Sequence, residues 1–150
     1  MRFAPRMSSP LKGVSNAGWQ SLVRALDVQA IDAISASGGL GSYDMRPRRL
    51  EEIGLMTNLR TLRTLEGRQV HEGDFVAPMT RDSFLKDPLV QYQALVKSMT
   101  LYYENLGSFK GLSRSATLAV LHRGGRGALS AWPNLFTDTA SLVVRCQAAF

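Results

Sequence analysis

The chain has little cysteine and histidine. Its single cysteine, Cys146, excludes a disulfide within the chain and any cysteine-based metal cluster. Its place in an apolar helical pattern predicts a small buried side chain. His71 and His122 are the only histidines. His71 lies near Glu72 and Asp74, but one histidine beside two acids in a turn does not define a metal site, and His122 follows an apolar run that predicts partial burial. We expect no metal and no cofactor.

Long apolar runs are also absent. No stretch approaches the ~18 apolar residues that a membrane span requires, so none is expected. Residues 1–13 have no continuous apolar centre, unlike a signal peptide. Pro5 and Pro10 instead predict an extended N-terminal arm over residues 1–13, suited to lying along a neighbouring chain. Residues 14–150 are long enough to form one domain with a single core.

The charge balance is strongly basic. The net charge is +6 over 150 residues, with 45% hydrophobic and 20% charged residues, which is typical of a globular protein with polyanionic partners. Such partners include nucleic acid, acidic lipid, a cell-wall polymer or an acidic protein face. The arginines recur along the chain and no nucleic-acid-binding module is recognisable, so nucleic acid is not expected.

Apolar spacing and capping residues predict a mostly helical chain. Asp87-Pro88 is the clearest start signal, because a capping carboxylate precedes a proline in the first helical turn. Between Leu59 and Pro78 an imperfect alternation surrounds a Glu66-Gly67 turn and predicts a small hairpin over 57–78. The predicted class is α+β, predominantly α-helical. Helices are expected near residues 15–26, 28–34, 47–53, 87–106, 113–122, 129–132 and 138–150.

A glycine-rich stretch, residues 38–50, connects two of the predicted helices. Gly38, Gly39 and Gly41 allow the backbone to turn sharply, and Pro47 fits the first turn of the following helix. Such a turn between buried helices can build a site or can simply reverse the chain.

Five segments occur in an order that resembles a known family. They are Trp19–Leu26, the glycine-rich stretch into Tyr43, the Arg-Pro-Arg-Arg-Leu-Glu-Glu-Ile-Gly-Leu segment, Phe84-Leu85-Lys86-Asp87-Pro88, and the AVLHRGGRGA segment from Ala119. Together, over residues 14–150, they resemble the lysozyme-like peptidoglycan hydrolases of phage particles and prophages. The resemblance implies a lysozyme-like single domain whose catalytic glutamate stands in a Glu-Ser-Gly-Gly motif.

The chain departs from that family at its catalytic position. Aligning Ala36-Ser37-Gly38-Gly39 with Glu-Ser-Gly-Gly puts Ala36 where the acid should be, and a methyl group cannot protonate a glycosidic oxygen. Asp44 stands where the family tends to carry glutamine, which puts the corresponding sugar contact in doubt. Asp32, one helical turn before Ala36, and Asp44 are the candidates for a substitute acid.

Basic residues supply the candidate binding groups. Arg46, Arg48 and Arg49 beside Tyr43 form either a docking surface for an acidic partner or polymer, or a solvated helix face balanced by Glu51 and Glu52. Two further arginines, Arg123 and Arg126, lie in a glycine-rich corner. That corner could bind phosphate or carboxylate, but a compact corner with outward arginines is preferred.

Two functional hypotheses follow. The first is a catalytically degenerate lysozyme-like domain that serves as a structural or interaction component of a phage tail or baseplate. It would be made in the bacterial cytoplasm and assembled in multiple copies with other virion proteins, with peptidoglycan as a further candidate ligand. The second is an active muramidase or lytic transglycosylase of the virion that uses Asp32 or Asp44 as its acid.

Overall fold

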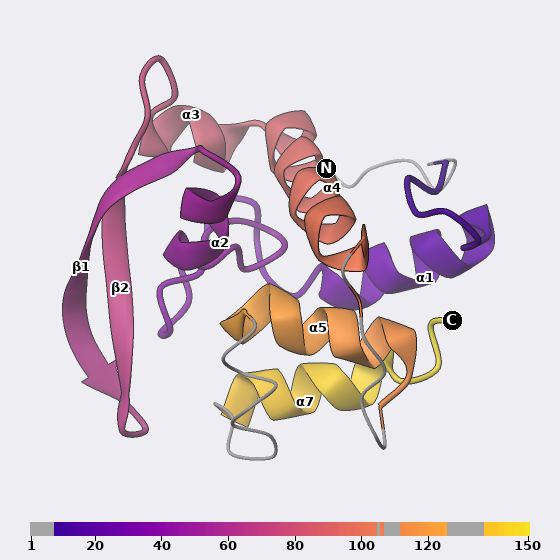
Figure 1. Cartoon of the computed structure of the whole chain (residues 1–150). Helices are drawn as coiled ribbons and strands as arrows, with labels where there is room; N and C mark the ends of the chain where they lie inside the picture. The colour runs from indigo at the N-terminus through magenta and orange to yellow at the C-terminus, as the bar shows by residue number, and fades with distance from the viewer. Residues whose placement is uncertain (1–7, 105, 107–111, 126–136) are drawn as a thin grey trace. The chain divides into compact units, whose positions relative to one another are not determined.

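The computed structural model describes residues 8–104, 106, 112–125 and 137–150, and for 137–140 it describes the backbone alone. The described residues form six helices and one two-stranded antiparallel sheet (Figure 1). This mixed architecture is compatible with the predicted α+β class. The fold divides into two compact units, Val28–Ser98 and the described residues before and after it. None of the described helices is long and apolar enough to cross a membrane.

The first unit contains the predicted hairpin. Strand β1, Met56–Leu65, pairs with strand β2, Arg68–Phe75, and Leu65 lies opposite Arg68. The turn residues Glu66 and Gly67 both have positive φ, 52° and 76°, as a two-residue turn that matches the strand twist requires. The prediction of a hairpin around Glu66-Gly67 is therefore confirmed.

Two helices and the first part of a third, which continues past Ser98, accompany the hairpin in this unit. Helix α2, Pro47–Glu52, contacts both strands. Helix α4, Pro88–Glu104, begins as predicted, since Asp87 Oδ1 accepts hydrogen bonds from the amides of Leu89 and Val90 at 3.0 and 3.2 Å. Helix α3, Arg81–Lys86, was not predicted from the sequence. Its start is a capping box between Thr80 and Ser83, which is a weaker signal than the usual pairing with a glutamate.

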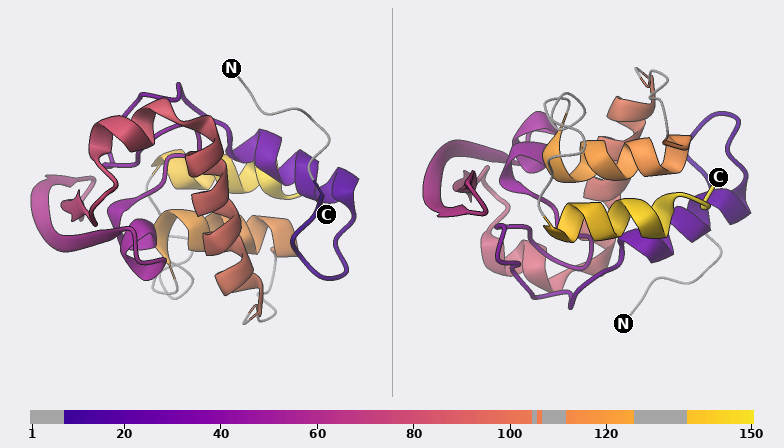
Figure 2. Two further views of the ribbon diagram at one scale, coloured as in Figure 1. Left: turned by 90° about the horizontal axis from the view of Figure 1, so that it is seen from above. Right: turned by 90° about the horizontal axis from the view of Figure 1, so that it is seen from below.

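The second unit is helical in its described residues. Helix α1, Asn16–Leu26, is capped by Ser15 and buries Trp19, Leu22, Val23 and Leu26 as predicted. Helix α5, Arg114–Gly124, lies beside helix α7, Thr137–Cys146, and α7 also contacts α1 (Figure 2). Apolar side chains from α5 and α7 form the core between these two helices. They are Ala116, Val120 and Val143, with Leu112 packed against them.

Cys146 is fully buried, as the sequence predicted. Burial raises the pKa of its thiol to about 11, although the nearby Arg145 and Arg123 act in the opposite direction. The thiol therefore stays protonated near neutral pH and packs as a small apolar group.

Residues 8–13 are the described part of the predicted N-terminal arm. Leu11 is buried, its carbonyl accepts a hydrogen bond from the amide of Val14 at 3.1 Å, and the amide of Ser9 donates to Asn16 Oδ1 at 2.8 Å. These contacts hold the segment against the start of α1. Residues 1–7 and the short helix predicted over 129–132 lie outside the described residues.

The helix predicted over 28–34 is wrong. In its place the chain forms turns and a bridge between Ile34 and Leu40. The backbone of this segment bonds to the glycine-rich turn instead of to its own preceding turn: the Gly41 amide donates to the Ala33 carbonyl and the Ser35 amide donates to the Gly39 carbonyl, both at 2.9 Å. The argument that Asp32 and Ala36 share a helical face therefore no longer applies.

Candidate functional site

The glycine-rich turn is held from within by side-chain amides. Gln29 Nε2 donates hydrogen bonds to the carbonyls of Gly39 and Gly41 at 3.2 and 2.9 Å. Each of these buried carbonyls also accepts a backbone hydrogen bond, Gly39 from the Ser35 amide at 2.9 Å and Gly41 from the Asp44 amide at 3.0 Å, so Gln29 supplies a second donor to each. Residues 28–46 are thus an ordered scaffold within their unit and not a loose connection.

Gln91 of α4 is the second clamp on this scaffold. Its Oε1 accepts from the Ser42 amide at 2.9 Å, and its Nε2 donates to the carbonyls of Ile31 and Phe84 at 2.8 Å each. The side chain is 1% exposed. A Cβ at Gly41 would lie 2.3 Å from Gln91 Oε1, so only glycine leaves room for this amide. Sequence reasoning missed Gln91 because it stands 49 residues from Ser42.

Asp44 is buried, and its carboxylate contacts residues of the turn itself. Its Oδ1 accepts from the Ser35 hydroxyl at 2.7 Å and its Oδ2 pairs with Arg46 Nη2 at 3.3 Å. A Cβ at Gly39 would lie 1.5 Å from Asp44 Oδ1, so the glycine makes room for the carboxylate. Because both oxygens hold neighbouring groups, Asp44 is placed to stabilise the turn.

The other two positions of the proposed catalytic site are exposed. Asp32 points to solvent, and among the described residues it makes no hydrogen bond or ion pair. Ala36 is also exposed, and its carbonyl accepts a hydrogen bond from Arg63 Nη2 of β1. The structure thus brings Asp44 into the scaffold through Ser35 and Arg46 but gives Asp32 no such link.

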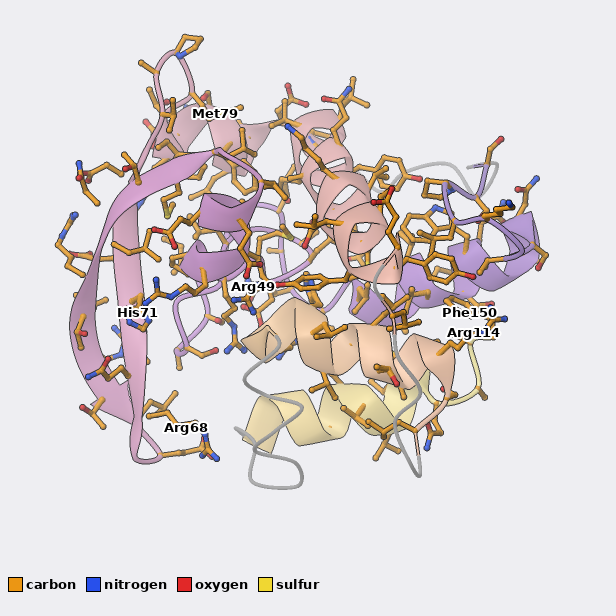
Figure 3. The ribbon with its side chains drawn as sticks, viewed as in Figure 1. Arg49, Arg68, His71, Met79, Arg114 and Phe150 are labelled. Carbon is orange, nitrogen blue, oxygen red and sulfur yellow. The ribbon has the colours of Figure 1, made fainter. Side chains whose placement is uncertain are left out.

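The basic surface expected around the start of α2 is mostly buried. Tyr43, Arg46 and Arg49 are 4%, 6% and 3% exposed, so the expectation that they form a solvated or docking face is wrong for these three. Arg49 pairs with Glu52 at 2.9 Å, and Figure 3 shows it labelled on α2. The guanidinium groups are used within the fold, where arginine tolerates burial because it keeps charged partners.

Arg48 keeps the predicted exposure. Its guanidinium pairs with Glu51 of the same helix at 3.2 Å, and both side chains are open to solvent. An exposed pair of this kind contributes little to stability. Arg48 is the residue of the predicted docking surface that a partner could reach.

The predicted glycine-rich corner after α5 is described only in part. Gly125 ends the helix with a φ of 70°, which fits the prediction of a turn that glycine favours. Arg123 is 5% exposed, so the expectation that it faces outward is wrong. Arg126 lies outside the described residues. His122 is fully buried, more so than predicted.

A small pocket opens in the first unit beside the glycine-rich turn. It has a volume of about 50 Å³. Its lining comes from residues 34–40, α2, both strands and α3, and because these elements are separate in the sequence, no sequence pattern indicated the pocket. The lining residues are Ile34, Gly38, Leu40, Pro47, Met56, Leu62, His71, Glu72, Gly73 and Arg81.

His71 is the titratable group of this pocket whose environment is most unusual. It lies on β2 (Figure 3). Desolvation lowers its pKa, the positive charge of Arg48 lowers it further, and Glu51 acts in the opposite direction. His71 is therefore mostly neutral near pH 7. In the described part of the chain, no group of three or more His, Cys, Asp or Glu side chains could hold a metal ion.

Comparison of the chain with protein-family models, with curated proteins and with solved structures finds no match. The site must therefore be interpreted from its own residues.

Proposed function

We propose that the chain is a non-catalytic, lysozyme-like domain that works as a structural and protein-binding component of a phage tail or baseplate. The observation that carries this proposal is the chemistry at the acid position. Ala36 places a methyl group there, and the buried carboxylate of the adjacent turn, Asp44, is engaged by Ser35 and Arg46.

The chemistry of glycoside cleavage supports this view. A general acid must carry a proton at neutral pH and be held against the leaving oxygen, usually in an apolar pocket. Asp44 has both oxygens committed to the turn. Asp32 is exposed, and no described side chain orients it. Neither carboxyl group meets both requirements.

The charge of the chain supports a role in assembly. A net charge of +6 favours association with acidic protein faces, and complementary charge steers such encounters. The partners would be other tail or baseplate proteins, in a multimeric assembly.

A turbidity assay on purified peptidoglycan tests the absence of catalysis. The unmodified chain is expected to cause no clearing. Clearing by the unmodified chain that is lost in Asp32→Asn or Asp44→Asn would overturn the proposal. Asp82→Asn, which changes an exposed carboxylate on α3, is the matched control for Asp32→Asn. Circular dichroism of Asp44→Asn separates loss of an acid from loss of the fold.

The placement in a virion has its own test. Mass spectrometry of purified phage particles should detect the chain at a fixed ratio to tail proteins. Arg48→Glu, which reverses the exposed charge on α2, should lower its incorporation while leaving the helical spectrum unchanged. Absence of the chain from washed particles would refute the virion role.

A further inference from the structure

The pocket beside the glycine-rich turn combines an apolar floor with an apolar rim. Among its lining side chains, Leu40 and Met56 are 2% and 3% exposed and form the buried part, whereas Ile34 and Leu62 are each 47% exposed and form the rim. Two large, half-exposed aliphatic side chains at the mouth of one pocket form a local apolar patch, which is a feature of protein-binding surfaces.

The size of the pocket selects the kind of group that fits. Its volume is about 50 Å³, whereas pockets for sugars and other small molecules usually have about 300 Å³ or more. One aliphatic side chain fills such a space. A short anchor of this kind, set in a small pocket and surrounded by weaker contacts, is the usual form of a binding hot spot.

The charges around the pocket favour an acidic partner. The lining carboxylate, Glu72, pairs with Arg60 at 3.0 Å, and Arg60 is shared with Asp74 at 3.3 Å. Arg81 lines the pocket and is exposed, and Arg63 reaches the Ala36 carbonyl from β1. Neither of these two arginines has a carboxylate partner among the described residues, so both charges remain open to a ligand.

We propose that this pocket docks an extended segment of a partner protein, in which one aliphatic side chain enters the pocket and a neighbouring carboxylate pairs with Arg81. The inference rests on the proposed function in that it names the docking surface of an interaction domain. A second copy of this chain is a poorer occupant, because its net charge of +6 repels the same arginines.

Amide-resolved NMR spectra of isotopically labelled protein test the docking directly. The probe is the blocked peptide acetyl-Gly-Leu-Asp-Asp-amide, added to about 10 mM, since a single anchor gives a dissociation constant in the millimolar range. Shifts are expected at the amides of Ile34, Leu62 and Gly73. Acetyl-Gly-Ser-Asp-Asp-amide and acetyl-Gly-Leu-Lys-Lys-amide should each bind at least about fivefold more weakly, because one lacks the anchor and the other reverses the charge.

Two variants with matched controls complete the test. Arg81→Glu should weaken binding of the acidic peptide about fivefold or more, while Arg24→Glu, the same charge change at an exposed position of α1, should not. Leu62→Ser should abolish the shifts, whereas Val144→Ser, at a 77% exposed position of α7, should leave them intact. Well-dispersed spectra of each variant show that the fold is retained.

Several results would overturn the docking proposal. They are equal binding of the lysine peptide, shifts confined to other residues, or no shifts at the highest concentration. Shifts at the same amides with an N-acetylglucosamine trimer would identify a saccharide site, and peptide-free shifts that grow with protein concentration would identify a second copy as the occupant. Failure of the peptide with no clearing of peptidoglycan removes the docking surface but not the proposed function. Clearing of peptidoglycan together with peptide binding would refute the proposed function and leave the docking surface intact.

Discussion

Truncation of Gln91 should destabilise the glycine-rich turn more than any other single polar change there. Gln91→Ala removes three hydrogen bonds, to the Ser42 amide and to the carbonyls of Ile31 and Phe84. Each is worth about 1 kcal/mol. The buried Cγ methylene, which alanine lacks, adds about 0.8 kcal/mol. We expect the free energy of unfolding to fall by about 4 kcal/mol, a large share of the total stability of a small protein.

Urea unfolding followed by circular dichroism measures this loss, and amide exchange at Ser42 locates it. The matched control is Gln93→Ala, because Gln93 lies on the same helix but is exposed. The control should change stability by no more than about 0.5 kcal/mol. If Gln91→Ala costs under about 1 kcal/mol, or if exchange at Ser42 is unchanged, the amide does not clamp the turn and the reasoning fails.

Three further predictions concern Gly39, Cys146 and His71. Gly39→Ala should cost about 3 kcal/mol or more, because its Cβ would displace the Asp44 carboxylate; Gly54→Ala, where nothing lies within 4 Å and only φ is strained, should cost about 1 kcal/mol in the same urea titration. With a pKa of about 11, native Cys146 should react with iodoacetamide at pH 8 about 100-fold more slowly than the unfolded chain, and equal rates would contradict its burial. Since burial lowers the pKa of His71, the unfolded chain takes up a proton first as the pH falls from about 7 to about 5. Stability should therefore fall over that range and fall less in His71→Gln, so parallel profiles would count against the shift.

The elements that the sequence predicted correctly are those with strong local signals. The hairpin needs only residues at Glu66-Gly67 that accept positive φ, and α4 needs only the Asp87-Pro88 start. Each of these preferences acts over a few residues. The amino-acid sequence alone is therefore sufficient to predict these elements.

Contacts between residues far apart in the sequence determined the structure where the sequence prediction was wrong. The segment 28–34 has apolar residues at helical spacing, but its backbone groups find partners in residues 39–45, and that pairing replaces the helix. Arg49 lies in a run of charged residues that predicts an exposed helix face, yet its side chain is 3% exposed and paired with Glu52. Propensity is a weak prior where tertiary hydrogen bonds and burial compete with it.

Some features of the candidate site could be predicted from the sequence, and others depend on the tertiary structure. Composition and residue order established the basic charge, the absence of a disulfide framework and the alanine at position 36, because these depend on residue identity alone. Whether Asp44 is placed as a catalytic acid or as a structural residue depends on the atoms around it. The turn surrounds its carboxylate with the Ser35 hydroxyl and the Arg46 guanidinium. The pocket exists only where residues 34–40, α2, the two strands and α3 meet, since its shape and charge come from their packing and from no element by itself.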